Sequence, residues 1–361
     1  MENLILYIVA GFFLIGAIDY ILGDRLSLGY LFKDGLNTMG PLAISMVGII
    51  SLTPVITEGL NLFLVPIAEK IGIDPSIFVS SIIAIDMGAF NIAENISISQ
   101  NMIYFSGVLM ASILGCTLSF TLPLALGIIK KESRREFFIG TLFGIITIPI
   151  GLFVGGLLLN IPIKIILINL LPIIIISILL GLGIAYKGDI MIKAFDVFGK
   201  IIVVISIIGL TLQGIQSISG LVIFNNLMPL QEALTIVGKI AIFLGGAYVM
   251  LEVIKRVLEK PLDRISNKFG VNNYSIAAFL GSLASAIIVF LNFEKLDSKG
   301  RILCSAFSVG GAYVLGGQLG FVASEAPKIV SIYIFTKLLC GLLAILIAIL
   351  YIKSKENKIK V

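Results

Sequence analysis

The chain has 361 residues, of which 58% are hydrophobic and 13% charged, and its formal net charge is +5. With a mean hydropathy of +1.11, it carries more apolar surface than a water-soluble domain of this length could bury, so the composition predicts an integral membrane protein. The basic residues lie in short loops and near the C-terminus, where they set orientation in a bilayer, so the positive charge does not indicate a nucleic-acid partner.

The residue types that the chain lacks bear on its chemistry. It contains no histidine, and its three cysteines stand singly within apolar runs. The sequence therefore offers neither the usual metal ligand nor a Ser–His or Cys–His nucleophile pair. We expect no metal site, no cofactor and no enzyme activity.

About eleven apolar segments follow one another along the chain, beginning with a run that we interpret as a retained helix and not a signal peptide. The longest polar gaps are only loop-sized, so we expect one all-helical membrane domain over residues 1–361. The segments cover residues 4–22, 40–68, 75–93, 102–129, 137–160, 163–186, 198–222, 235–257, 274–293, 301–323 and 328–352.

Two of these segments follow the same lead-in. The first lead-in is Lys70-Ile-Gly-Ile-Asp-Pro-Ser76 and the second is Lys268-Phe-Gly-Val-Asn-Asn-Tyr-Ser275. A duplicated unit, with short or polar-interrupted apolar segments at matching places, is typical of secondary transporters. We therefore predict internal repeat units over about 40–130 and 235–325.

The basic loops predict how many segments cross the membrane. Residues 130–135 form the strongest basic loop, which should be cytoplasmic. If every later segment crossed, the C-terminal lysines would end outside, against this rule. The conflict disappears if segment 274–293 enters and leaves on the cytoplasmic side as a re-entrant hairpin. The repeat then predicts a matching hairpin at 75–93, dipping in from outside.

The sequence thus predicts nine full crossings plus two re-entrant hairpins in an inverted repeat. The N-terminus would lie outside and the C-terminus in the cytoplasm. We expect the tips of the two hairpins to meet near the centre of the membrane, where secondary transporters of this kind bind their substrates.

Asp86 is the first candidate for substrate binding. It lies in Ile85-Asp-Met-Gly-Ala-Phe90, and a carboxylate at membrane depth is costly unless it is paired or faces water. Asn91 and Glu94 follow at near-helical spacing. We interpret these residues as a site for a cation or an ammonium group. The alternative is that Asp86 caps the hairpin by binding backbone amides, and the two roles can coexist.

The second hairpin offers Ser282 and Ser285, whose hydroxyls suit a hydroxyl or an amine, although small residues also serve close helix packing. Ahead of the first hairpin, Thr53, Thr57 and Glu58 surround Pro54. Because proline removes a backbone donor and frees a carbonyl, we predict a helix break here that could also hold an ion.

A set of short motifs occurs in order over roughly residues 40 to 330. The motifs are Ile85-Asp-Met-Gly-Ala-Phe90, Gly144-Ile-Ile-Thr-Ile-Pro-Ile-Gly151, Leu244-Gly-Gly-Ala-Tyr248, Glu259-Lys-Pro-Leu262, Val271-Asn-Asn273, Asp297-Ser-Lys-Gly-Arg301, Cys304-Ser-Ala-Phe307 and Leu319-Gly-Phe321. In these motifs the chain resembles the ethanolamine utilisation permease family, EutH. The resemblance implies a multi-pass transporter of the cytoplasmic membrane that brings ethanolamine to a degradative pathway.

The chain departs from the family pattern at two places. Ala284-Ser-Ala-Ile287 stands where the family has an Asn-Asn-Ile-Pro run, and Gly317-Gln318 stands where it has an Asp-His pair. Ethanolamine is mostly protonated at neutral pH, so we expect Asp86 to pair with its ammonium. Ser282, Ser285, Asn91 and Gln318 are the candidates for its hydroxyl.

Two other functions stay open at this point. One is transport of a different small polar substrate, and the other is a polytopic membrane assembly protein that transports nothing. The sequence also leaves open the coupling ion and the oligomeric state, with a homo-oligomer among the options.

Overall fold

The computed structural model describes residues 4–359 and, within that range, all side chains except those of residues 184–185, 188–189, 191–192, 195–196, 258–269 and 356–359. The side chains of the motif at residues 259–262 thus lie outside the described set. All regular secondary structure in residues 4–359 is helical, which confirms the predicted all-helical class.

The helices follow one another with short connections. They are α1 (Leu4–Ile21), α2 (Gly29–Asn37), α3 (Met39–Lys70), α4 (Ser76–Ser80), η1 (Ile85–Met87), α5 (Ala89–Ile96), α6 (Gln100–Met102), η2 (Ile103–Gly115), η3 (Thr117–Thr121), α7 (Leu122–Ile128), η4 (Lys131–Ser133), α8 (Arg134–Leu158), α9 (Ile163–Ser219), α10 (Leu230–Phe269), α11 (Asn273–Ser282), α12 (Ile287–Leu291), η5 (Phe293–Lys295), α13 (Ser298–Gly310), α14 (Gly317–Glu325), η6 (Pro327–Ile329) and α15 (Val330–Ile359).

Eight helical stretches among the described residues are long and apolar enough to cross a membrane. They cover Leu4–Ile21, Gly29–Lys70, Gln100–Ile128, Lys131–Leu158, Ile163–Gly183, Val197–Ser219, Leu230–Val257 and Pro327–Lys355. The fifth and sixth belong to one helix, α9, which kinks at Lys187 with φ −136° and ψ 41°. Eight of the nine predicted crossings therefore correspond to a helix of spanning length.

The ninth, segment 301–323, is not one helix but two. Between α13 and α14 the chain is non-helical, and Tyr313 has a φ of +63°, which is rare for a bulky residue. Here Tyr313 N donates to Ser282 O at 3.0 Å and Leu315 N donates to Leu283 O at 2.8 Å. The backbone thus bonds to the turn after α11 instead of continuing its own helix.

The helix break predicted at Thr53, Thr57 and Glu58 is wrong. Helix α3 runs through Pro54 without interruption from Met39 to Lys70. A proline removes only one donor from the ladder, and neighbouring groups can compensate in a long buried helix. The other backbone hydrogen bonds of this 32-residue helix outweigh the one that is lost at Pro54.

The two segments that share a lead-in are each divided into short helices. We call them the first broken segment (residues 74–98, with α4, η1 and α5) and the second broken segment (residues 272–297, with α11, α12 and η5). Asp74 Oδ2 accepts a hydrogen bond from Ile98 N at 2.9 Å, and Asp297 Oδ1 accepts one from Asn272 N at 2.9 Å. The start and the end of each segment therefore lie together.

The turn of each broken segment lies close against a glycine further along the chain, Gly115 in η2 and Gly316 just before α14. A Cβ on Gly115 would be 2.1 Å from Ile83 O, and a Cβ on Gly316 would be 2.0 Å from Ala284 O. Only glycine permits backbones to approach this closely. The two close approaches are about 200 residues apart in the chain.

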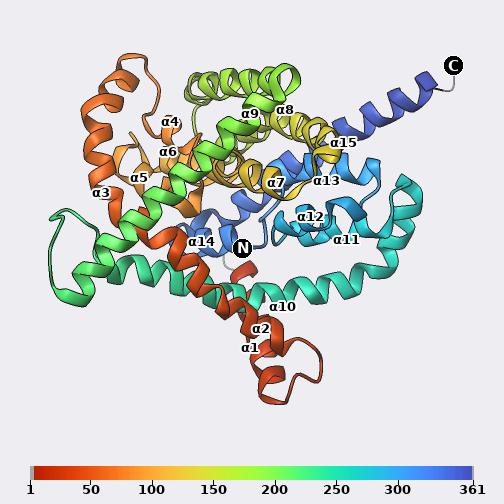
Figure 1. Ribbon diagram of the computed structural model, residues 1–361, viewed down its shortest axis with the longest axis horizontal. Helices are drawn as coiled ribbons and strands as arrows, with labels where there is room; N and C mark the ends of the chain where they lie inside the picture. The colour runs from red at the N-terminus through yellow and green to blue at the C-terminus, as the bar shows by residue number, and fades with distance from the viewer. Residues whose placement is uncertain (1–3, 360–361) are drawn as a thin grey trace.

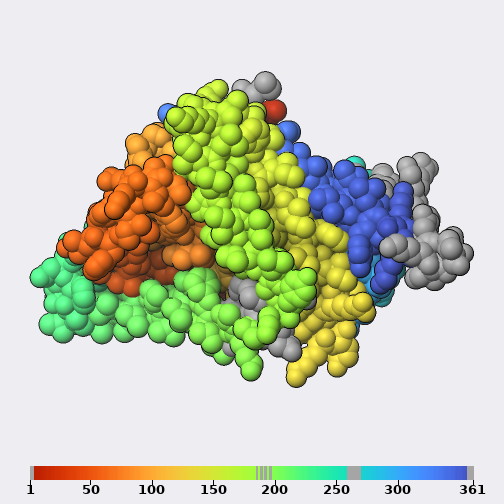
Figure 2. Space-filling view, turned by 90° about the horizontal axis from the view of Figure 1, so that it is seen from above, coloured from red at the N-terminus to blue at the C-terminus, as the bar shows by residue number. Residues whose placement is uncertain are grey.

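The rest of the fold surrounds this core. In Figure 1 the loop between α9 and α10 lies at the left end and α15 leaves at the right end. Figure 2 shows α9 lying across the outside of the molecule between α3 and α8. Apolar side chains of α9 such as Leu171 and Ile208, 55% and 51% exposed, suit contact with lipid.

The glycine contacts can be tested by Gly115→Ala and Gly316→Ala. Each added methyl group would overlap a carbonyl oxygen, so we expect each variant to lose about 1–3 kcal/mol of stability, the usual cost of overpacking. Thermal unfolding in detergent would measure the loss. Gly127→Ala and Gly317→Ala are matched controls, because both positions face open space. Equal stability of tested and control variants would contradict the close packing.

Candidate functional site

Asp86 lies in η1, at the turn of the first broken segment. Gly88, with a φ of +93°, ends η1, and a Cβ there would lie 2.5 Å from Ile49 Cγ2. The tight turn packed on α3 therefore fixes where the Asp86 carboxylate lies. The carboxylate is surrounded by protein but partly accessible. Apart from its own backbone N–H, it accepts no hydrogen bond from the described residues.

A buried lysine of α15 lies in the same region of the interior. Lys337 is 1% exposed, and its Nζ donates to Ser112 O at 2.8 Å and to Gln318 Oε1 at 2.9 Å. Asp86 and Lys337 interact electrostatically, although no direct ion pair joins them among the described side chains. Oppositely charged groups from η1 and α15 thus share the interior of the protein.

Gln318, at the start of α14, links the two charges. Lysine has only donors, so the amide atom that faces Lys337 must be the oxygen, which places Gln318 Nε2 on the other side. That nitrogen is buried and makes no regular hydrogen bond among the described residues; the acceptor near it is the Cys116 sulfur, which is a weak one. A buried amide donor without a strong acceptor is costly, so it is available to a ligand oxygen.

Two tyrosines and a cysteine line the same region. Tyr333 Oη donates to Gln318 Oε1 at 3.4 Å, and the Tyr333 ring centroid lies 5.8 Å from Lys337 Nζ. Tyr313 and Cys116 also lie in the neighbourhood of Asp86. Tyr313 Oη also lies near the backbone of Ala286, in the turn of the second broken segment.

The two predicted serines lie at that second turn, and their hydroxyls are already used. Ser282 is fully buried, and its Oγ donates to Phe279 O at 2.6 Å. Ser285 Oγ accepts from Ile287 N at 3.4 Å. Both bonds are to backbone within three residues, so the serine hydroxyls stabilise the turn. Of the two serines, Ser285 lines a pocket.

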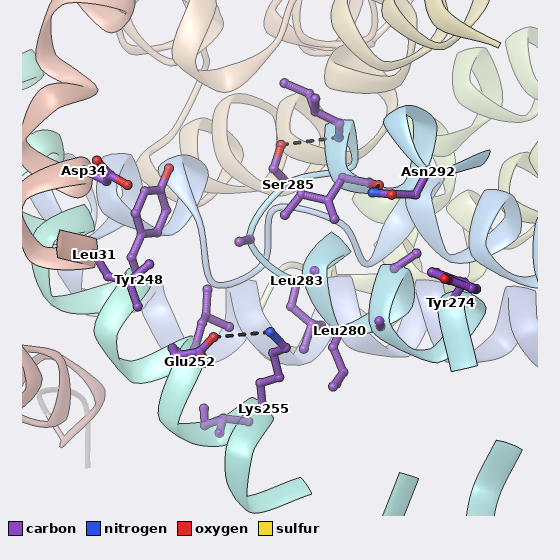
Figure 3. Close-up of a pocket in the computed structure, with 18 residues that line it drawn as sticks. Leu31, Asp34, Tyr248, Glu252, Lys255, Tyr274, Leu280, Leu283, Ser285 and Asn292 are labelled. Carbon is purple, nitrogen blue, oxygen red and sulfur yellow. Dashed lines mark hydrogen bonds and ion pairs between the residues drawn. The ribbon is translucent and has the colours of Figure 1, made fainter. Parts of the chain in front are cut away.

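Ser285 lines a pocket of about 580 Å³ between the second broken segment, α2 and α10. Figure 3 shows Asp34 and Tyr248 beside each other on one wall, with Ser285 and Asn292 on the opposite wall. Glu252 is joined to Lys255 by an ion pair of 3.4 Å. The pocket is large enough for a small polar molecule.

The remaining predicted residues have no hydrogen bond or ion pair to Asp86 or Lys337 among the described residues. Asn91 is 5% exposed, and its Oδ1 has no partner in the described part of the chain. Glu94 is exposed and interacts with Glu325 at the end of α14. Thr53, Thr57 and Glu58 line a second pocket, of about 520 Å³, along α3.

Comparison with known proteins assigns the chain to a family. The family model described as "Ethanolamine utilisation protein, EutH" matches residues 1–351. The chain belongs to the EutH family. Since it also has eight helical stretches of spanning length in its described part, it is a multi-pass membrane protein.

The relatives that resemble this EutH-family chain match it over nearly their full length. A "Probable ethanolamine permease EutH" of Listeria monocytogenes is 39% identical, covering 100% of this chain and 97% of the relative. A protein of the same name from Salmonella typhimurium is 32% identical, covering 99% and 97%. An uncharacterized Bacillus subtilis protein, YxeR, is 36% identical over 95% and 93%. No solved structure matches the chain.

Sequence reasoning found Asp86 and Gln318 in this EutH-family chain, but it missed Lys337. The signal was present, because Lys337 stands ten residues into an apolar segment of membrane length. An ionisable residue inside such a segment is by default a candidate functional residue. Tyr313 and Tyr333 carried no comparable signal, since tyrosine is ordinary in apolar helices.

The role of the turn in placing Asp86 can be tested by Gly88→Ala, with Gly72→Ala as control. Both glycines have positive φ, so each alanine should cost about 1–2 kcal/mol. Gly72 has open space around it, whereas Gly88 packs on Ile49. We expect both variants to lower the unfolding temperature, but only Gly88→Ala to weaken substrate binding in a direct binding assay. Equal binding by the two variants would contradict this role.

Proposed function

We propose that this chain is a permease that carries protonated ethanolamine across the cytoplasmic membrane. The observation that carries the proposal is the Asp86 carboxylate, which is enclosed by protein and lacks a direct partner. Its full-length relatives named as probable ethanolamine permeases support the choice of substrate. An ammonium group needs a counter-charge at such depth, and Asp86 supplies it.

The hydroxyl of the substrate is assigned to Gln318. Its Nε2 is a buried donor without a strong acceptor in the described structure, and its Oε1 is held by Lys337. Asn91 Oδ1 is a second unpaired polar atom and could accept from the hydroxyl. Ser282 and Ser285 are assigned a supporting role, because their hydroxyls already bond to nearby backbone.

We further propose that the two broken segments are re-entrant hairpins of an inverted repeat, over about residues 40–130 and 235–325. The hydrogen bonds between the start and the end of each segment support this, because such a segment enters and leaves at one place. The matching contacts at Gly115 and Gly316 support equivalence of the two copies. Tyr313 lies near both Asp86, in the first turn, and Ala286, in the second. This position supports a meeting of the two hairpin tips.

The two pockets are proposed as the paths to this site. The pocket beside the second broken segment would open to the cytoplasm, and the pocket along α3 would open to the outside. Acidic side chains occur in both, namely Asp34 and Glu252 in the first and Glu58 in the second. Negative charge at a mouth raises the local concentration of a cationic substrate.

A different small polar substrate is favoured by one observation. The second turn presents only small residues and serines already bonded to backbone, so it contributes few groups to recognise a hydroxyl. Competition of labelled ethanolamine uptake by other small amines would reveal a broader or different preference.

Asp86→Asn tests the site. The substitution keeps shape and hydrogen bonding but removes the charge, so ammonium binding should weaken by about 1.5–3 kcal/mol, the value of a charged hydrogen bond. Uptake of labelled ethanolamine into proteoliposomes would measure it, with Glu232→Gln at an exposed position of α10 as control. If Asp86 only caps the turn, Asn serves nearly as well and uptake stays at the wild-type level.

Labelling of single cysteines tests the topology. The native cysteines are buried, so background reaction with a membrane-impermeant maleimide should be low. We expect Asn61→Cys, in the pocket along α3, to react in intact cells. Lys295→Cys, at the end of the second broken segment, should react only after permeabilisation. Reaction of Lys295→Cys from outside would overturn the re-entrant arrangement.

A further inference from the structure

Lys337 occupies an unusual place for a lysine. It lies in the apolar helix α15, is 1% exposed, and bonds through Nζ to Ser112 O and Gln318 Oε1. A charged side chain at membrane depth is costly, so its retention needs a compensating anion. Asp86 is the nearby carboxylate: it lies in η1, which packs against η2 and α14, the two elements that accept hydrogen bonds from Lys337 Nζ.

The hydrogen-bonding capacity of Lys337 is not filled. An ammonium group has three donors, and in the described structure two of them have acceptors. Neither Lys337 nor Asp86 is joined to the other directly, although the two charges interact. Lys337 therefore offsets the charge of Asp86 without forming a hydrogen bond to either carboxylate oxygen.

The side-chain end of lysine and protonated ethanolamine present the same chemical group, a primary ammonium on a CH₂. We propose that Lys337 is a tethered counter-cation for Asp86, which balances the carboxylate when the site is empty and yields it to the ammonium of the substrate. This inference rests on the proposed function, because it describes how the same site handles its charge when empty and when loaded.

The charges of the two states follow directly. The empty site holds one carboxylate and one ammonium, so it is neutral and can change orientation without moving charge through a medium of low dielectric constant. The loaded site carries one added positive charge. Net uptake therefore moves one charge per substrate and responds to the membrane potential.

Replacing Lys337 by a neutral residue reverses this balance. In Lys337→Met the loaded site is neutral, whereas the empty site carries an uncompensated carboxylate. The empty carrier should then reorient slowly while the loaded carrier still moves. Net uptake requires the empty step, but exchange of internal for external substrate does not.

The test uses purified full-length protein in proteoliposomes. For Lys337→Met we expect the ratio of net uptake to exchange of labelled ethanolamine to fall by about tenfold or more, because the lost bond to Gln318 weakens binding equally in both assays. Lys239→Met, at an exposed position of α10, is the control and should change neither. Lys337→Gln serves as a second neutral variant if Lys337→Met does not fold.

A purely structural lysine would give a different result. Its two hydrogen bonds join α15 to η2 and α14, so their loss would lower net uptake and exchange together, in proportion to the folded fraction. Parallel loss of both activities, or no loss of either, would overturn the proposal.

A second measurement does not depend on the substrate. Removing one member of a buried charge pair leaves the other unbalanced, so Asp86→Asn and Lys337→Met should each lower the unfolding temperature, and the double variant should lower it less than their sum. If the wild-type protein transports no ethanolamine, the proposed function fails. The comparison of the two single variants with the double variant still tests whether Asp86 and Lys337 form a charge pair. Additive shifts would overturn the counter-cation role.

Discussion

The structure depends on one constraint, which is that non-helical backbone at membrane depth must find its hydrogen bonds within the protein. The chain interrupts its helices in three places, in the two broken segments and between α13 and α14. Each interruption is compensated by a neighbour. Ser119 Oγ accepts from Ala84 N at 3.1 Å in the first turn, and the second turn accepts from Tyr313 N and Leu315 N.

The polar side chains at the ends of the broken segments serve the same constraint. Asp74 accepts from Ser76 N and Ile98 N, and Asp297 accepts from Asn272 N and Ser275 Oγ. These carboxylates have full sets of donors, so they hold structure. Asp86 is different, because the fold leaves it without donors from other residues while keeping it inside. That contrast supports the proposed binding role of Asp86 and a structural role for Asp74 and Asp297.

The interior site joins parts of the chain that are distant in sequence. Asp86 comes from η1, Gln318 from α14 and Lys337 from α15. The bond from Gln318 Oε1 to Lys337 Nζ orients the amide, and the orientation leaves Nε2 without a strong acceptor. The proposed ligand recognition and the proposed balancing of charge therefore both involve Gln318 and Lys337.

The amino-acid sequence by itself determined the membrane class, most of the helical segments and the two interrupted segments, because apolar length and glycine content are local properties. It also singled out Asp86 and Gln318 as candidate site residues, which stays a prediction. It misled at Pro54, where one lost donor was too little to break a long helix. It also treated 301–323 as one helix, since only the turn of the second broken segment, bonding across to Tyr313 and Leu315, makes the break favourable. Which charges face one another was decided by tertiary structure alone, because the meeting of η1, α14 and α15 depends on packing between distant segments.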